Sequence, residues 1–241
     1  TPLVWTHLIP ATIEGRALHN VQNAMFAAAL AYNMEVGLED IRHGLRTFDS
    51  SFFQAPGRMN IYDEHPFRVI LDYAHNPAAV RVMCELVDRF KVEGRKTIVL
   101  SAPGDRRDED IREIAAIAAG HFDHFICRCD DGRRGRGEDE VAVMLKNKLL
   151  EEGISIDQIE VIPNEQEAVA RALEMADAGD MILVLGDNIK RTWKQIIYFN
   201  SGAHAEDTGK RVSAAIELPD TGGFHLDANI EIISDERGVR I

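Results

Sequence analysis

Residues 67–77 join an apolar run to side chains that could do chemistry. The run is β-branched in its middle, which predicts a buried strand, and it ends in the carboxylate of Asp72. His75 and Asn76 follow, then Pro77; an N-cap asparagine before a proline predicts that a helix begins there. Polar groups at the carboxyl end of a strand are where α/β sheets bind ligands. The alternative is that Asp72 only caps the helix.

Two more sets of side chains could contact a nucleotide. Asn20 and Asn23 share one face of an alanine-rich predicted helix, and their carboxamides could bind the polar edge of an adenine. Helix capping is the simpler explanation for both. Arg58 follows a Pro-Gly turn, from which its guanidinium could bind two phosphate oxygens. A solvated surface arginine is the alternative for Arg58.

Two charged loops follow later predicted strands. Residues 102–110 follow a strand at 96–100, and the acidic residues 108–110 are predicted to cap the next helix, where its dipole favours them. Residues 130–138 follow a strand at 122–128 and are dense in glycine and in both charges, which predicts a surface loop. Its carboxylates could bind a cationic ligand and its arginines an anionic one, or the loop could simply be solvated.

Strands and amphipathic helices alternate along most of the chain. This order predicts an α/β fold in which a mostly parallel sheet is covered by helices on both faces. The predicted strands are 59–62, 67–72, 96–100, 122–128, 159–162 and 181–185, and the predicted helices are 17–33, 38–48, 77–91, 111–120, 139–151, 165–176 and 188–197. A strand of a preceding element is expected within residues 1–10. Residues 200–241 are expected to be a tail with one hairpin.

The composition narrows the class of protein. The 241 residues carry 27 basic and 40 acidic side chains, a formal net charge of −13, which argues against nucleic-acid or membrane-surface binding and permits a cationic substrate. No apolar run could span a membrane, and no signal peptide is expected. Cys84, Cys127 and Cys129 lack metal or redox spacing and are predicted to be reduced thiols of a cytoplasmic protein. His121 and His124 have no third ligand, so no metal site is predicted.

Five motifs, taken in order, resemble those of the Mur ligase superfamily, whose members form amide bonds with ATP. They are HNxxN at 19–23, PGR at 56–58, DYAHNP at 72–77, GDRRDED at 104–110 and DDGRRGRGE at 130–138. The GDRRDED and DDGRRGRGE motifs favour the Mur-ligase-like C-terminal half of the cyanophycin synthetases. The muramyl peptide ligases carry a DNPR-type loop in place of DDGRRGRGE. The resemblance covers residues 9–197.

The resemblance implies a division of the chain into three parts. Residues 51–200 would be a Rossmann-like Mur ligase C-terminal domain. Residues 1–50 would be the closing helices of a truncated central ATP-binding domain, because they cannot bury their apolar faces by themselves. Residues 201–241 would be a tail of uncertain structure. The chain begins without methionine and is expected to be a piece of a longer protein.

The resemblance also implies a reaction, in which a carboxylate attacks the γ-phosphate of ATP and an amine then displaces phosphate from the acyl phosphate. In cyanophycin synthetases the amine is arginine and the carboxylate is the β-carboxylate of an aspartate in the growing polymer. The implied nucleotide-binding residues are Asn20 and Asn23 at the adenine, Arg58 at the phosphates, Asp72 at the ribose, and His75 and Asn76. Arg58, Asp72 and His75 would be the catalytic residues. The residues implied to face the incoming amino acid are Asp105, Arg106, Asp130, Asp131, Arg133, Arg136 and Glu138.

One departure from the superfamily limits what the chain could do alone. No GxxxxGK[ST] P-loop, whose backbone wraps the phosphates, occurs in the sequence. ATP and Mg²⁺ are the expected cofactors, with the Mg²⁺ ligands mainly in the missing central segment, so no ligase activity is predicted for the chain by itself. The full-length enzyme is expected to be a homo-oligomer that acts on small molecules and a peptide-like polymer. The alternatives are another Mur-type ligase, of the muramyl peptide or folylpolyglutamate kind, and a non-catalytic binding domain.

Overall fold

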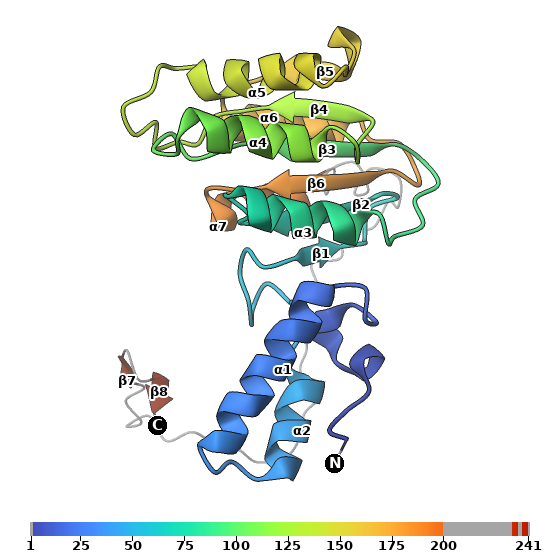
Figure 1. Ribbon diagram of the computed structural model, residues 1–241, viewed down its shortest axis with the longest axis vertical. Coiled ribbons are helices and arrows are strands. Elements are labelled where there is room, and N and C mark those ends of the chain that lie inside the picture. The colour runs from blue at the N-terminus through green and yellow to red at the C-terminus, as the bar shows by residue number, and fades with distance from the viewer. Residues whose placement is uncertain (1, 200–232, 236–237, 241) are drawn as a thin grey trace, which may run out of the picture. The chain divides into compact units, whose positions relative to one another are not determined.

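A computed structural model describes residues 2–199, 233–235 and 238–240 of the chain. The first of its two units, Thr1–Ser201, contains a six-stranded sheet with helices on both faces (Figure 1). Four of the five strand pairings in this sheet are parallel and one is antiparallel. The predicted α/β fold with a mostly parallel sheet is therefore confirmed.

The strand order in the sheet is β1-β2-β6-β3-β4-β5, so β6, which comes last of the six in the chain, lies in the interior of the sheet. The strands are β1 (Asn60–Tyr62), β2 (Arg68–Asp72), β3 (Lys96–Leu100), β4 (His124–Cys127), β5 (Ile159–Val161) and β6 (Met181–Leu185). Strand β6 pairs in parallel with β2 on one side and with β3 on the other. Since parallel strands point the same way, the loops after β2, β3, β4, β5 and β6 leave the sheet at one edge, where α/β proteins bind ligands.

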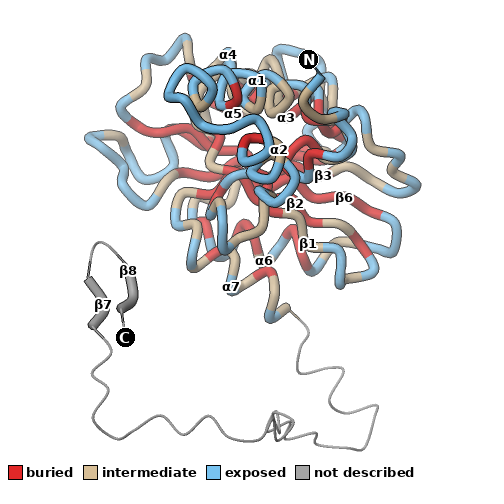
Figure 2. Tube along the Cα trace, turned by 90° about the horizontal axis from the view of Figure 1, so that it is seen from below, coloured by how far each residue is buried: buried red, intermediate tan, exposed pale blue. Residues whose placement is uncertain are grey.

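Helices cover both faces because the strands are apolar on both (Figures 1 and 2). One face carries α3 (Pro77–Val87), α4 (Asp108–Ala118) and α5 (Glu140–Glu151), and the other carries α6 (Glu165–Glu174) and α7 (Ile189–Ile197). Side chains alternate along each strand. Ile70 and Leu100 therefore pack with the first group of helices, and Val69 and Val99 pack with the second. A 3-10 turn, η3 (Ile156–Gln158), precedes β5.

Two helices precede the sheet, as predicted: α1 (Leu18–Asn33) and α2 (Leu38–Thr47). In α1 only Ala28 is buried, whereas Phe26 and Leu30 are 69% and 66% exposed. An apolar helix with so little cover is unusual for a surface helix, which normally hides its apolar stripe. That these helices belong to a central ATP-binding domain stays a prediction.

The strand expected near the start of the chain is wrong for its described part, residues 2–10. The segment instead forms two 3-10 turns, η1 (Thr6–Leu8) and η2 (Pro10–Thr12). Pro10 begins the second turn, and a proline lacks the N–H that a strand would need there while its fixed φ suits a helical start. The apolar content of residues 2–10 was therefore not sufficient to predict a strand.

The acidic run at residues 108–110 lies in the first turn of α4, but the prediction that it caps the helix is wrong. The N-cap residue is Arg107, and no side chain makes the cap hydrogen bond. The carboxylates turn to arginines instead: Asp110 pairs with Arg107 at 2.7 Å and Asp108 pairs with Arg136 at 2.7 Å. Their position still suits the positive end of the helix dipole.

The three cysteines are free and buried, as predicted. Burial raises the pKa of Cys84 and of Cys127 to about 12, so neither is a thiolate at neutral pH. Among the described residues, no helix combines the length and the apolar content needed to cross a membrane.

The second unit, Gly202–Ile241, contains two described strands. Strand β7 (Ile233–Asp235) pairs antiparallel with β8 (Gly238–Arg240). This pair agrees with the hairpin expected in the tail. The other residues of that tail lie outside the described ranges.

Candidate functional site

A buried side chain fixes the turn that carries Arg58. Asn60 is fully buried; its Oδ1 accepts the N–H of Gly57 at 2.7 Å, and its Nδ2 donates to two backbone carbonyls of the preceding segment at 2.8 and 2.9 Å. Gly57 has a φ of 72°, and a Cβ there would lie 2.9 Å from Cγ1 of Ile189 in α7. The turn therefore needs glycine for its backbone and for its close approach to the helix. Sequence reasoning placed Asn60 only on a strand.

Asp72 lies beside this turn. It is 6% exposed, and its Oδ2 accepts the N–H of Met59 at 2.8 Å. Burial raises the pKa of Asp72, while the Met59 N–H and the positive charge of Arg58 act in the opposite direction. The guanidinium carbon of Arg58 lies 6.0 Å from the centre of the Tyr73 ring. The structure therefore brings Arg58 and Asp72 together at the end of β2.

His75 and Asn76 begin the connection from β2 to α3. Oδ1 of Asn76 accepts a backbone N–H in the first turn of α3 at 2.9 Å, so Asn76 is the cap, and the alternative that Asp72 caps this helix is wrong. Nδ1 of His75 lies 2.9 Å from the carbonyl oxygen of Tyr73. A carbonyl can only accept, so Nδ1 is the donor in this contact.

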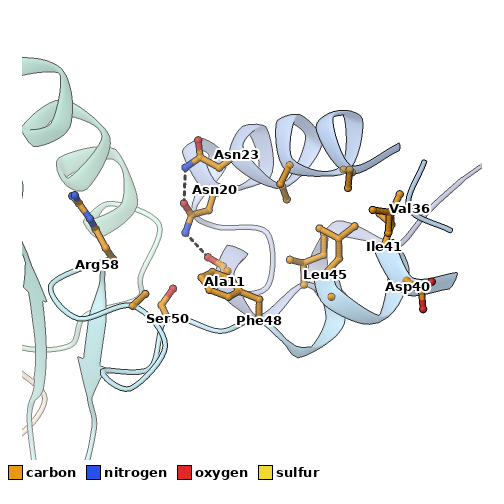
Figure 3. A pocket seen from close by; sticks show the side chains of 17 residues that line it. Ala11, Asn20, Asn23, Val36, Asp40, Ile41, Leu45, Phe48, Ser50 and Arg58 are labelled. Atoms are coloured by element: carbon orange, nitrogen blue, oxygen red, sulfur yellow. Dashed lines mark hydrogen bonds between the residues drawn. The ribbon is translucent and has the colours of Figure 1, made fainter. Parts of the chain in front are cut away.

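A cavity of about 560 Å³ lies between α1, α2 and the Arg58 turn (Figure 3). Asn20 and Asn23 border it: Nδ2 of Asn20 donates to a carbonyl of η2 at 2.8 Å, and Nδ2 of Asn23 donates to Oδ1 of Asn20 at 3.0 Å. Most of the remaining wall is formed by alanines and larger aliphatic side chains. Asn20, Asn23 and Arg58 thus share one cavity, and Asp72 and His75 do not line it.

This cavity, here called the helix cavity, has residues that could hold part of a nucleotide. An apolar wall with carboxamides at its edge fits a purine base, and Arg58 supplies one cation for a phosphate. The sequence holds no P-loop to wrap the other phosphates. Among the described residues, no group of three or more His, Cys, Asp or Glu side chains could hold a metal ion. The residues present could therefore contact the base and one phosphate.

A second cavity, of about 470 Å³, lies beyond the carboxyl ends of β4 and β5. It is lined by Cys129, Asp130, Asp131, Arg133, Glu138, Pro163, Asn164 and Glu167. Four residues predicted to face the incoming amino acid are among them. Asn164 and Glu167 were not predicted, although β5 follows β4 in the chain and its loop could have been expected to meet the loop after β4. We call this the acidic cavity, since its wall holds four carboxylates and one guanidinium.

Three carboxylates of the acidic cavity already face an arginine. The pairs are Asp130–Arg128 at 3.2 Å, Asp131–Arg191 at 2.7 Å and Glu138–Arg133 at 3.0 Å. Burial raises the pKa of Asp130, and the charge of Arg128 acts in the opposite direction. The carboxylate of Glu167 has no partner in the part of the chain that the structure describes. Glu167 is therefore the one carboxylate of this cavity that has no cationic partner among the described residues.

The other three predicted residues lie outside the acidic cavity, where they fasten two loops together. Nη1 of Arg134 donates to both carboxylate oxygens of Asp105, at 2.7 and 2.8 Å. Arg136 donates to the carbonyls of Gly104 at 3.0 Å and of Arg106 at 2.9 Å. The loop after β3 is thereby tied to the loop after β4. A direct role of Asp105, Arg106 and Arg136 in substrate binding stays a prediction.

Residues 57–188 match a family model described as the Mur ligase, glutamate ligase domain. The chain belongs to this family. The matched range contains Arg58, Asp72 and His75 as well as every residue that lines the acidic cavity. The recognition of a Mur ligase C-terminal domain from the motifs is therefore confirmed.

This Mur ligase domain is similar to parts of several longer enzymes. A cyanophycin synthetase from Crocosphaera subtropica is 37% identical to it over 183 residues, which are 76% of this chain and 21% of that protein. A UDP-N-acetylmuramoyl-L-alanyl-D-glutamate–2,6-diaminopimelate ligase from Clostridium acetobutylicum is 28% identical over 70% of this chain and 33% of its own. The solved structure of E. coli FolC with DHPP and ADP aligns with a TM-score of 0.53 at 26% identity, over 75% of this chain and 38% of that chain.

The chain spans about a fifth of the length of the cyanophycin synthetase that it matches. The predicted preference for this branch of the superfamily is supported by the higher identity, 37% against 28% for the muramyl peptide ligase.

Proposed function

We propose that this Mur ligase domain works in an ATP-dependent ligase, with a nucleotide beside Arg58 and Asp72 and an arginine in the acidic cavity. The observation that carries the proposal is the acidic cavity, in which Glu167 has no partner among residues 2–199 and the other three carboxylates are paired with arginines. Its position at the carboxyl edge of a parallel sheet supports a role in ligand binding.

A guanidinium is the cation that suits this cavity best. The wall carries four carboxylates and the single guanidinium of Arg133, so a cationic side chain would find a net negative environment. Guanidinium has donors on several sides of a plane and can bond two carboxylates at once, whereas an ammonium is a compact point charge. With Asp130, Asp131 and Glu138 partly satisfied, Glu167 is the carboxylate left to form a two-point contact.

The reaction follows the superfamily pattern. A substrate carboxylate attacks the γ-phosphorus of ATP and releases ADP, and the α-amine of arginine attacks the acyl phosphate, forms the amide and releases phosphate and a proton. Arg58 would bind phosphate oxygens, Asp72 the ribose and His75 the nearby nucleotide surface. Asn20 and Asn23 would contact the base. Catalysis by this lobe is positioning together with stabilisation of phosphate charge.

Similarity to the cyanophycin synthetases supports arginine as the amine and a polymer aspartate as the carboxylate. ATP is supported by FolC, which is similar in structure and was solved with ADP. We expect ATP with Mg²⁺ as cofactors and a cytoplasmic homo-oligomer as the full-length enzyme, with Mg²⁺ ligands outside the described residues.

The test is the Michaelis constant for L-arginine in the intact ligase that contains this chain, with Glu167→Gln compared with Glu174→Gln. Both residues lie on α6 and are exposed, but only Glu167 lines the acidic cavity. Loss of the free carboxylate removes a charge-assisted contact, so Glu167→Gln should raise the KM for arginine about tenfold or more, and Glu174→Gln should leave it within about twofold.

An unchanged arginine KM in Glu167→Gln would show that the amine binds elsewhere. Activity with diaminopimelate in place of arginine would favour the muramyl peptide ligase alternative.

A further inference from the structure

A fully buried ion pair lies behind the acidic cavity. Arg128, at the end of β4, and Glu165, at the start of α6, are both 0% exposed, with Nη2 and Oε1 3.3 Å apart. Removing two charges from water is costly, and a buried ion pair is weak evidence for stability. Nε of Arg128 has no hydrogen-bond partner among the described residues, which adds to that cost. A pair of this kind calls for an explanation other than packing.

The guanidinium of Arg128 connects the ends of two strands, β4 and β6. Its Nη2 donates to the carbonyl of Leu185 at the end of β6, and its Nη1 donates to the carbonyl of Cys129 at 2.9 Å. The same Nη1 lies 3.2 Å from Oδ1 of Asp130, which lines the acidic cavity. Because β3 lies between β4 and β6 in the sheet, the guanidinium reaches across the end of one strand to another. Asp130 is therefore held against the rigid edge of the sheet.

Glu165 contacts a second arginine, Arg191, as well as Arg128. It accepts the N–H groups of Asp187 at 2.7 Å and of Asn188 at 3.2 Å, where β6 runs into α7. It also pairs with Arg191 in α7, and Nη1 of Arg191 lies 2.7 Å from Oδ2 of Asp131. The sequence of contacts runs from Asp130 through Arg128, Glu165 and Arg191 to Asp131. Both ends are carboxylates of the acidic cavity.

We propose that Arg128, Glu165 and Arg191 are positioning residues that fix the carboxylates of Asp130 and Asp131 so that the acidic cavity accepts a guanidinium in preference to an ammonium. A planar guanidinium needs acceptors at set directions, and an ammonium tolerates many. Rigid placement of the carboxylates of Asp130 and Asp131 therefore favours a guanidinium over an ammonium. This inference rests on the proposed function of the acidic cavity.

Arg191 is the residue on which to test the proposal, because its side chain is 30% exposed and its replacement leaves the buried Arg128–Glu165 pair intact. The matched control is Arg171→Gln, which removes an arginine of α6 that pairs with Glu160, outside the acidic cavity. In the intact ligase, Arg191→Gln should raise the KM for L-arginine about tenfold with kcat within about threefold. The inhibition constant for L-lysine should change less than threefold. Arg171→Gln should change neither the KM for L-arginine, nor kcat, nor the inhibition constant for L-lysine.

Rescue separates positioning from a structural role. Arg191→Lys keeps the charge but cannot fork onto Glu165 and Asp131 together, so it should recover kcat/KM for arginine only in part. The melting temperatures of Arg191→Gln and Arg171→Gln should agree within a few degrees, which excludes general loss of folding. An arginine KM that does not move in Arg191→Gln, or arginine and lysine binding that weaken by the same factor, would overturn the inference.

The two proposals fail in different ways. If Glu167→Gln leaves arginine binding unchanged, the acidic cavity is not the arginine site and the proposed function falls. If Glu167→Gln weakens arginine binding while Arg191→Gln does not alter the preference for arginine over lysine, only the positioning role is wrong.

Discussion

The side chain of Asp72 is buried, and it lies next to the exposed Arg58, which is expected to bind phosphate. Its Oδ2 accepts the N–H of Met59 at 2.8 Å, and the backbone of Ala74 also hydrogen-bonds to this carboxylate. Burial raises its pKa, which means that the folded state pays for the ionised form at neutral pH. A carboxyl group with a perturbed pKa at the carboxyl end of a strand is a candidate for contact with a ligand.

The pH dependence of stability tests this account of Asp72. A carboxyl whose pKa is higher in the folded than in the unfolded state loses stability as pH rises from its ordinary value, near 4, through the folded value. Asp72→Asn should therefore be more stable than the wild type at pH 7, with a gain that shrinks as pH falls and vanishes below about pH 3.5. Urea unfolding of the purified chain between pH 3 and 8 measures the difference.

A variant that is less stable than the wild type by an amount growing with pH would mean the reverse, that Arg58 and Met59 outweigh burial and lower the pKa of Asp72.

At the scale of elements, the close approach of two loops depends on one glycine. A Cβ at Gly104 would lie 2.2 Å from the carbonyl oxygen of Arg133 and 3.1 Å from Cγ of Arg136. Backbone cannot give way as a side chain would, so Gly104→Ala must separate the loops after β3 and β4. We expect a loss of about 1–3 kcal/mol in the free energy of unfolding, measured with denaturant.

Gly132→Ala is the matched control in the same region. Gly132 has open space where a Cβ would be added, so its replacement should alter the free energy of unfolding by no more than about 0.5 kcal/mol. Equal effects of the two alanines would mean that backbone entropy, not the contact with Arg133, governs Gly104.

Most elements could be predicted from the sequence because their apolar residues recur with clear periods. The pattern could not fix where α4 begins, at Asp108 rather than Ile111, since polar first turns carry no apolar signal. Nor could it place β6 between β2 and β3, because strand order depends on non-local pairing. Glu167 was missed for the same reason: it is ordinary in a helix, and only the neighbouring loop makes it part of a cavity.

At the scale of the whole chain, the two candidate sites are unequal. The acidic cavity is lined mostly by charged and polar residues, whereas the helix cavity is bordered by α1, in which Phe26 and Leu30 are exposed. The helix cavity also has a single cation, Arg58, among its lining residues. The described residues are thus better equipped for the amine than for the triphosphate.

We therefore expect no ligase activity from the purified 241-residue chain with ATP, Mg²⁺, arginine and an aspartate-containing acceptor. Without a P-loop, too few donors are present to stabilise the charge of the transferring phosphoryl group. Product detection by mass spectrometry is the measurement, with the intact ligase as the positive control. ATP-dependent amide formation by the chain alone would contradict this expectation.

The central position of β6 has a consequence for how the protein is made. Until residues 181–185 have left the ribosome, β1 and β2 on one side and β3, β4 and β5 on the other have no strand between them and form two separate ribbons. During synthesis the edges of β2 and β3 that pair with β6 therefore stay open until this strand is available. The segment that runs from β6 into α7 also brings Asp187 and Arg191 to their partners. Completion of the sheet and assembly of the acidic cavity therefore depend on the same segment.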